Sequence, residues 1–349
     1  MKAIEAPDFE TFVDDLIESD PREVVGVQYD GSKFVFAPLE RAADLRLDYD
    51  VTMLSPKKYF FPQTERLVQY RSDEDGYEME AGWADEGKIV VGVHPYDLVA
   101  IEQLDRVFIE SQGDEPYRRK RENSVLIGVT MQDVSPWSFA GSMGTATTDS
   151  GFDLMLTDLG DDFDGRYAVE IGSRTGSRLL EDAPVREASI EEVDEVARIE
   201  EALLDDFETE IEFPPEQLPT VLAAGHDAME IWEDYADGCL SCGTCNVICP
   251  TCYCFDVDVV DYLTDEDGAT VRRWDGCLLE DFAAVAQGEN FREEVVQRHR
   301  HRLLRKGRYI YERYGDIACI GCGRCSQHCV ADVANPAEIY NRLWRHANA

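Results

Sequence analysis

Three short runs of apolar and β-branched residues mark the first part of the chain. They cover residues 24–29, 88–93 and 124–129, and each contains or is followed by glycine or another turn-forming residue. Short apolar runs bounded by turn signals are typical of buried strands. They predict that the N-terminal part of the chain is an α+β or α/β domain.

Two segments of the same region have a helical pattern. Apolar and charged residues recur with helical spacing over residues 97–109, and a second helix is predicted from Ser189 to about residue 207, because Ser189 and Glu192 have capping-box spacing. Residues 141–144, Gly-Ser-Met-Gly, predict a loop. This loop fits neither a dinucleotide fingerprint nor a Walker loop, so we predict no nucleotide site.

A proline cluster separates this region from the rest of the chain. Pro214, Pro215 and Pro219 cannot donate helix hydrogen bonds, and the composition changes just beyond them. We therefore predict two domains, residues 1–214 and residues 215–349.

The sequence pattern of the second predicted domain indicates helices almost throughout. No strand pair is convincing there, so we expect an all-α domain. The segments with helical patterns are residues 221–237, 278–287, 291–314 and 336–347.

Acidic residues greatly outnumber basic ones. The chain has 72 Asp and Glu against 33 Lys and Arg, a net charge of −39. Residues 239–349 contain 16 acidic and 13 basic side chains, so −36 of this charge falls on residues 1–238. Repulsion among so many acidic side chains would destabilise the fold in dilute buffer, whereas molar salt, with a Debye length of about 3 Å, screens it. We therefore predict a halophilic protein from a salt-filled cytoplasm. An acidic docking surface is the alternative interpretation. Nucleic acid is disfavoured as a partner, because binding to phosphates needs a basic surface.

The chain has no obvious targeting or membrane signal. The first ten residues lack the apolar stretch of a signal peptide, and no run of about 18 apolar residues occurs. We expect a soluble, cytoplasmic protein with no transmembrane segment.

All eleven cysteines lie between Cys239 and Cys329. Eight of them form two motifs with the same C-x₂-C-x₂-C-x₃-C spacing, beginning at Cys239 and at Cys319. In such a motif three thiolates bind one cubane, while the fourth reaches a second cluster. We therefore predict two [4Fe–4S] clusters with crossed ligands: Cys239, Cys242, Cys245 and Cys329 for cluster 1, and Cys319, Cys322, Cys325 and Cys249 for cluster 2.

Tetrahedral zinc is the alternative use of paired cysteines, but zinc does not require a duplicated four-cysteine run. Glycines within the motifs (Gly243, Gly321 and Gly323) favour clusters, because the backbone can then approach closely and aim N–H groups at sulfur. We predict no further cofactor and no catalytic residue.

Other residues of this region leave alternatives open. Cys252, Cys254 and Cys277 could support a third metal site, but burial as small apolar groups is the more common state of free cysteine. The basic run at residues 298–308 could face an acidic partner or the chain's own N-terminal domain, or form a solvated helix face that offsets the cluster charges and the acidic surface. The histidines of the region, His299, His301 and His328, are not predicted as ligands.

Several segments together resemble a known family. With them the chain is similar, over nearly its whole length, to the beta subunit of sulfhydrogenases and the A subunit of anaerobic sulfite reductases. The segments are Cys-Pro-Thr-Cys-Tyr-Cys-Phe at 249–255, Arg-Trp-Asp-Gly-Cys at 273–277, Cys-Ile-Gly-Cys-Gly-Arg-Cys at 319–325, Ser-Pro-Lys-Lys-Tyr-Phe-Phe-Pro at 55–62 and Gly-Val-His-Pro-Tyr-Asp at 92–97.

The resemblance implies two [4Fe–4S] clusters that relay electrons between a flavin-containing, NAD(P)H-binding subunit and a catalytic hydrogenase or reductase subunit. The cysteine region also resembles the all-helical ferredoxin domain of respiratory reductases, except that Val330 stands where proline is usual. Members of the family usually have cysteine at the position of Tyr96 and within residues 131–139, and this chain has none. An N-terminal metal site is therefore in doubt.

Three classes of function remain open from the sequence. The favoured class is a non-catalytic electron-transfer subunit of an oxidoreductase. A self-contained iron–sulfur reductase is the first alternative, although the chain lacks a Ser-His-Asp set and a flavin fingerprint. The second alternative is a zinc-stabilised interaction module.

Overall fold

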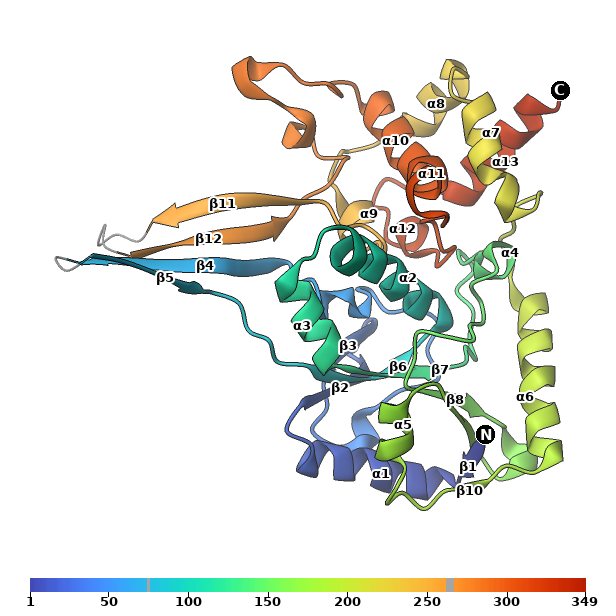
Figure 1. Ribbon diagram of the computed structural model, residues 1–349. Coiled ribbons are helices and arrows are strands. Elements are labelled where there is room, and N and C mark those ends of the chain that lie inside the picture. The colour runs from blue at the N-terminus through green and yellow to red at the C-terminus, as the bar shows by residue number, and fades with distance from the viewer. Residues whose placement is uncertain (74–75, 262–266) are drawn as a thin grey trace.

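The computed structural model describes residues 1–73, 76–261 and 267–349 (Figure 1). Its N-terminal part is built on an eight-stranded sheet. In spatial order the strands are β10 (Arg186–Glu187), β1 (Lys2–Ile4), β9 (Tyr167–Ile171), β8 (Leu154–Asp158), β7 (Val125–Val129), β6 (Lys88–Val93), β2 (Glu23–Tyr29) and β3 (Phe34–Pro38).

The centre of this sheet is parallel and its flanks are antiparallel. Strands β2, β6, β7 and β8 run parallel, and the three predicted apolar runs are β2, β6 and β7. Helices α1 (Ala6–Ser19) and α5 (Arg174–Leu179) cover one face, and α2 (Pro95–Asp105) and α3 (Glu115–Asn123) cover the other (Figure 1). Because both faces are covered, the central strands are apolar on both sides. The N-terminal region is therefore α/β, one of the two predicted classes.

The helices of this region follow their sequence signals closely. The predicted helix at 97–109 is α2 and a following π-helical segment, Arg106–Ser111. The capping box is confirmed in α6 (Ile190–Leu203), where the Ser189 hydroxyl accepts from the Glu192 N–H and the Glu192 carboxylate accepts from the Ser189 N–H. The predicted loop at 141–144 is wrong, because Ala140–Met143 form the single-turn helix α4.

The C-terminal part contains most of the predicted helices, with different limits. The predicted helix at 278–287 is wrong: two 3₁₀ turns occupy this segment, and Gln287, at φ 77°, cannot continue a helix. The helices are α7 (Leu218–Ala224), α8 (Met229–Ala236), α9 (Thr244–Val247), α10 (Val295–Leu304), the π-helical Arg305–Tyr309, α11 (Ile310–Tyr314), α12 (Arg324–Gln327) and α13 (Pro336–Ala347).

The expectation of an all-α C-terminal domain is wrong. Strands β11 (Phe255–Asp261) and β12 (Asp267–Trp274) pair antiparallel, and β12 also pairs with β4 (Thr64–Asp73), which pairs with β5 (Gly76–Ala81). The two hairpins extend together away from the rest of the molecule (Figure 1). Aspartates in β11 weaken its intrinsic strand signal, and pairing with β12 overrides that weakness, because β12 is itself held by β4, a strand about 200 residues away in sequence.

The sheet of β4, β5, β11 and β12 joins segments from both predicted domains. We keep the division into residues 1–214 and 215–349 as a proposal. Within the described residues, no helix combines the length and the apolar character needed to cross a membrane.

Candidate metal centre

Each cysteine motif folds as a loop followed by a one-turn helix. The first motif leads into α9 and the second into α12, and a glycine with φ 73° precedes each helix, Gly243 and Gly323. A Cβ at Gly323 would lie 2.5 Å from the backbone of Trp137. The second motif therefore packs directly against the N-terminal region. We predicted that the glycines of the motifs let the backbone approach a cluster, but Gly323 is also needed for this close contact with the backbone of Trp137.

The eight motif cysteines line two separate cavities. Each cavity receives three cysteines from one motif and the fourth cysteine of the other, which is the grouping of the two predicted ligand sets. One cavity is lined by Cys239, Cys242, Cys245 and Cys329, and the other by Cys249, Cys319, Cys322 and Cys325. We name them the first and the second cysteine cavity.

The thiols differ in exposure and in pKa. Burial raises the pKa of Cys245 and of Cys322 to about 12, and that of Cys319 to about 11. Cys242 is exposed, and hydrogen bonding with the side chain and backbone of Thr244 lowers its pKa. Metal binding would displace the protons of the buried thiols. Among the described residues, no three His, Cys, Asp or Glu side chains converge on one metal-ion position.

Four buried cations surround the cysteine motifs without a carboxylate partner. None of them forms an ion pair within the described part of the chain, although buried charges normally require a counter-charge. They are Lys57, Arg298, Arg302 and Lys306.

Arg302 and Lys306 lie beside the second cavity and contact little besides neutral groups. Arg302 donates to the carbonyl of Cys245 at 3.2 Å, and its Nε makes no hydrogen bond. Lys306 donates to the Thr251 hydroxyl at 2.5 Å. Burial opposes the charge of Lys306, but the thiols of Cys249 and Cys252 raise its pKa overall. The second cavity therefore has a positive wall.

The basic run of α10 and the π-helical segment after it is not a solvated face. Arg298, Arg302 and Lys306 are buried, and they point into the cysteine region instead of toward solvent. Both sequence interpretations of this run, a docking surface and a solvated face, are therefore wrong for these three residues.

His299 has a buried ring in the wall of the first cavity. Neither of its ring nitrogens has a hydrogen-bond partner within the described chain. Burial, together with the charges of Arg302 and Arg298, lowers the pKa of His299 to about 4. The ring is therefore neutral at pH 7 and retains one N–H that can donate into the cavity.

Arg324 ties the second motif to the N-terminal region. Its guanidinium donates to both carboxylate oxygens of Asp97, at 2.8 and 2.6 Å, and to the carbonyl and hydroxyl of Thr52, at 2.7 and 2.9 Å. The side chains of Arg324 and Asp97 are fully buried. Burial raises the pKa of Asp97, and Arg324 opposes that rise.

Our sequence reasoning missed Lys57, Asp97 and Arg324 as residues of this region. Two signals were available: Lys57 and Asp97 lie in the segments that carry the family resemblance, and Arg324 lies between Cys322 and Cys325. Nothing in the spacing of the cysteines indicated that distant N-terminal residues contact the motifs.

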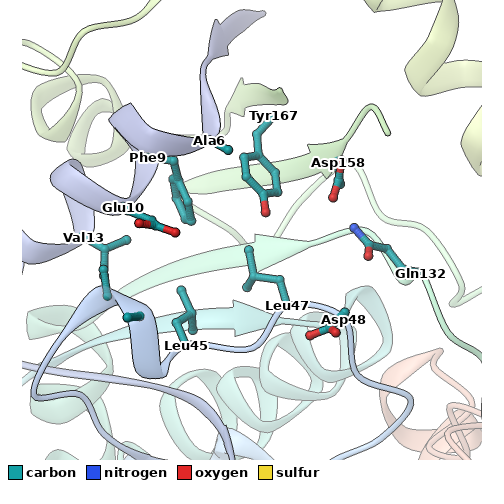
Figure 2. A pocket seen from close by; sticks show the side chains of 12 residues that line it. Ala6, Phe9, Glu10, Val13, Leu45, Leu47, Asp48, Gln132, Asp158 and Tyr167 are labelled. Atoms are coloured by element: carbon teal, nitrogen blue, oxygen red, sulfur yellow. The ribbon is translucent and has the colours of Figure 1, made fainter. Parts of the chain in front are cut away.

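A further pocket lies between α1, β8, β9 and residues 42–48, and no cysteine lines it (Figure 2). Figure 2 shows Tyr167 with Glu10, Asp48 and Asp158 around this pocket. Burial, aided by these carboxylates, raises the pKa of Tyr167 to about 12. The pocket contributes nothing to the cysteine cavities.

The residues of both cavities fit iron–sulfur clusters. Each cavity offers four sulfur ligands, and unpaired buried N–H donors and cations suited to an anionic group lie around it. A family model described as a 4Fe-4S dicluster domain matches residues 238–333. The chain is thus an iron–sulfur protein.

The chain is also similar to a curated protein along most of its length. It is 30% identical over 317 residues to the beta subunit of sulfhydrogenase 2 from Pyrococcus furiosus, and the match covers 89% of each chain. The protein belongs to the sulfhydrogenase beta-subunit family, as the sequence resemblance predicted.

Proposed function

We propose that this protein is the electron-transfer subunit of a multi-subunit oxidoreductase of the hydrogenase, sulfur reductase or sulfite reductase type. It passes electrons between a flavin- and NAD(P)H-binding subunit and a catalytic subunit through two [4Fe–4S] clusters, in the cytoplasm. The relative's description as a subunit of a sulfhydrogenase supports membership of such a complex.

Each cysteine cavity holds one cluster in this proposal. Cluster 1 takes the first cavity, and cluster 2 takes the second. The ligands are Cys239, Cys242, Cys245 and Cys329 for cluster 1, and Cys249, Cys319, Cys322 and Cys325 for cluster 2.

One observation carries the proposal: two four-cysteine cavities lie among buried cations that have no carboxylate partner in the described part of the chain. A buried, unpaired cation costs several kcal/mol. Clusters bound by thiolates are anionic, so their presence supplies the missing counter-charge.

The surrounding residues suit a relay more than a reaction with substrate. A [4Fe–4S] cluster bound in either cavity would accept and release one electron. Arg302 lines the second cavity and donates to Cys245 of the first, so one cation stabilises added negative charge at both. The bidentate contact of Arg324 with Asp97 ties the second motif to α2, which would limit reorganisation during electron transfer.

The test is to measure iron, acid-labile sulfide and EPR spectra on protein purified anaerobically in high salt. We expect at least about eight irons and eight sulfides per chain, and a loss of about four irons in each of the variants Cys242→Ser and Cys322→Ser. The two variants should lose different EPR signals. His328→Asn, within the second motif but outside the ligand set, is the control and should keep all of the iron.

Other outcomes would point to the alternative functions. Zinc without sulfide would overturn the relay and favour a zinc-stabilised interaction module. Turnover of a substrate by the isolated chain would instead favour a self-contained reductase.

A further inference from the structure

The three cysteines outside the two motifs come together at the base of the β11–β12 hairpin. Cys254 directly precedes β11, and Asp275 directly follows β12. The Asp275 N–H donates to the Cys254 carbonyl at 3.0 Å, which places Cys277, two residues further, beside the same strand ends. Cys252 lies two residues before Cys254. Strand pairing therefore unites thiols that are 25 residues apart in sequence.

One buried amide holds two of these sulfurs. Asn246 Nδ2 lies 3.5 Å from Cys277 Sγ and 3.8 Å from Cys252 Sγ. The Asn246 Oδ1 accepts from the Leu278 N–H at 3.1 Å, which fixes the orientation of the amide. A neutral thiol is a weak acceptor, whereas N–H groups aimed at sulfur are common around metal-bound thiolates.

A buried cation beside these thiols has no carboxylate partner among the residues that the structure describes. Lys57 donates only to the backbone carbonyls of Cys249 and Cys252, at 2.7 and 2.9 Å, and lies over the Trp274 ring at 4.2 Å. It is 2% exposed, forms no ion pair with the described residues and is not among the residues that line the two cysteine cavities. The sulfurs that act on the charge of Lys57 are those of Cys252, Cys249 and Cys254, so metal-bound thiolates at the hairpin base and in the second cavity would together supply its counter-charge.

We propose that Cys252, Cys254 and Cys277 bind a third iron–sulfur cluster of the cubane type. The inference rests on the proposed relay and adds one redox centre to it, so that electrons can pass from the second cavity to the base of the projecting hairpin. Binding releases the protons of the three thiols, and each transfer takes up one electron and gives up one electron. This assigns all eleven cysteines as ligands. If the third cluster has a fourth iron, the ligand of that iron is therefore not a cysteine.

A cluster is a better match than a single ion for this site. As in the two cavities, the sulfurs do not converge on one metal-ion position within the described chain. Three thiolates can span three irons of a cubane, whereas tetrahedral zinc would need a fourth protein ligand at close range.

The deciding experiment counts iron and sulfide on the full chain, purified anaerobically in high salt, with Mössbauer spectra to identify the clusters. We expect about eleven or twelve irons per chain in the wild type, and about eight in the double variant Cys254→Ser/Cys277→Ser. The double variant should keep the EPR signals that Cys242→Ser and Cys322→Ser remove. The wild-type count decides the question even if the double variant does not fold.

The two proposals fail in different ways. About eight irons in wild type and double variant alike, with Cys322→Ser still losing four, would overturn the third site and leave the two-cluster relay in place. A disulfide between any two of the three cysteines in the purified protein would also overturn the third site. Zinc without sulfide would overturn the relay itself.

Discussion

Buried cations occur in two regions of this protein and are neutralised differently. Three buried cations where the N-terminal region contacts the β11–β12 hairpin and the second motif have a carboxylate partner: Lys120 and Arg272 share Glu65, and Arg324 pairs with Asp97. Around the cysteine motifs, Lys57, Arg298, Arg302 and Lys306 have no carboxylate among the described residues.

The difference shows which charges the polypeptide balances by itself. In the first region the counter-charge is part of the chain, so the pairs are complete once the chain folds. In the second region the cations surround sulfurs instead: burial raises the pKa of Cys245 and of Cys322, whereas a hydrogen bond with Cys252 and the charges of the neighbouring cations lower the pKa of Cys249. This region is complete only when an anionic metal–thiolate group is bound.

The largest effect is expected where a complete pair is broken. Asp97→Asn keeps the shape of the side chain but leaves the fully buried Arg324 without a counter-charge. We expect the free energy of unfolding to fall by about 3–5 kcal/mol, measured by urea denaturation of the anaerobic protein. Asp316→Asn, which breaks the more exposed pair with Arg106, should cost less than about 1 kcal/mol. Equal losses in the two variants would contradict the comparison.

Removing a cation from the second region should change a reduction potential. Lys306→Met takes a buried positive charge away from the second cavity, so the added electron there is less stabilised. We expect the potential of one cluster to fall by about 60 mV, a tenfold change in a one-electron equilibrium, in an EPR-monitored redox titration.

Arg308→Met is the matched control for Lys306→Met. It removes a cation from the same helical segment, but Arg308 is half-buried and pairs with Glu312. Its effect on the potential should be much smaller. If both variants shift the potential equally, the buried cations do not act on the cluster in the way that the comparison requires.

The smallest effect concerns Glu192, a buried carboxylate of the N-terminal region that pairs with two partly exposed arginines. Hydrogen bonds to the Glu192 carboxylate lower its pKa. The bond from Arg186 has the largest effect, and those from the Ser189 N–H and Arg166 have smaller effects. A lowered pKa stabilises the fold above the unfolded value of about 4.3, and this contribution is lost as the pH falls below it.

Glu192→Gln should therefore cost no more than about 1 kcal/mol at pH 7, because the partner arginines are solvent-screened. The difference in melting temperature between wild type and variant should shrink as the pH is lowered from about 5 toward 2. A difference that grows on acidification would contradict this assignment.

Much of the N-terminal fold could be predicted from local pattern. The runs that became β2, β6 and β7 are short and apolar because these strands are covered on both faces, and the capping box of α6 was evident at Ser189 and Glu192. The hairpin of β11 and β12 was not predictable in the same way. Of its two strands, β12 pairs with β4, a partner about 200 residues earlier in the chain.

The sequence by itself determined the chemistry of the cysteine region. The spacing of the two motifs alone predicts two four-cysteine sets, and the distribution of charge separates a strongly acidic N-terminal region from a nearly neutral remainder. Adaptation to high salt stays a prediction.

Only the tertiary structure decided what surrounds the sulfurs. It turned the basic run of α10 inward, brought Lys57 and Asp97 to the motifs from the other end of the chain, and united Cys252 with Cys277 at a hairpin base. The physical reason is that a motif's ligand spacing is a local property, whereas burial and charge compensation depend on contacts between distant segments.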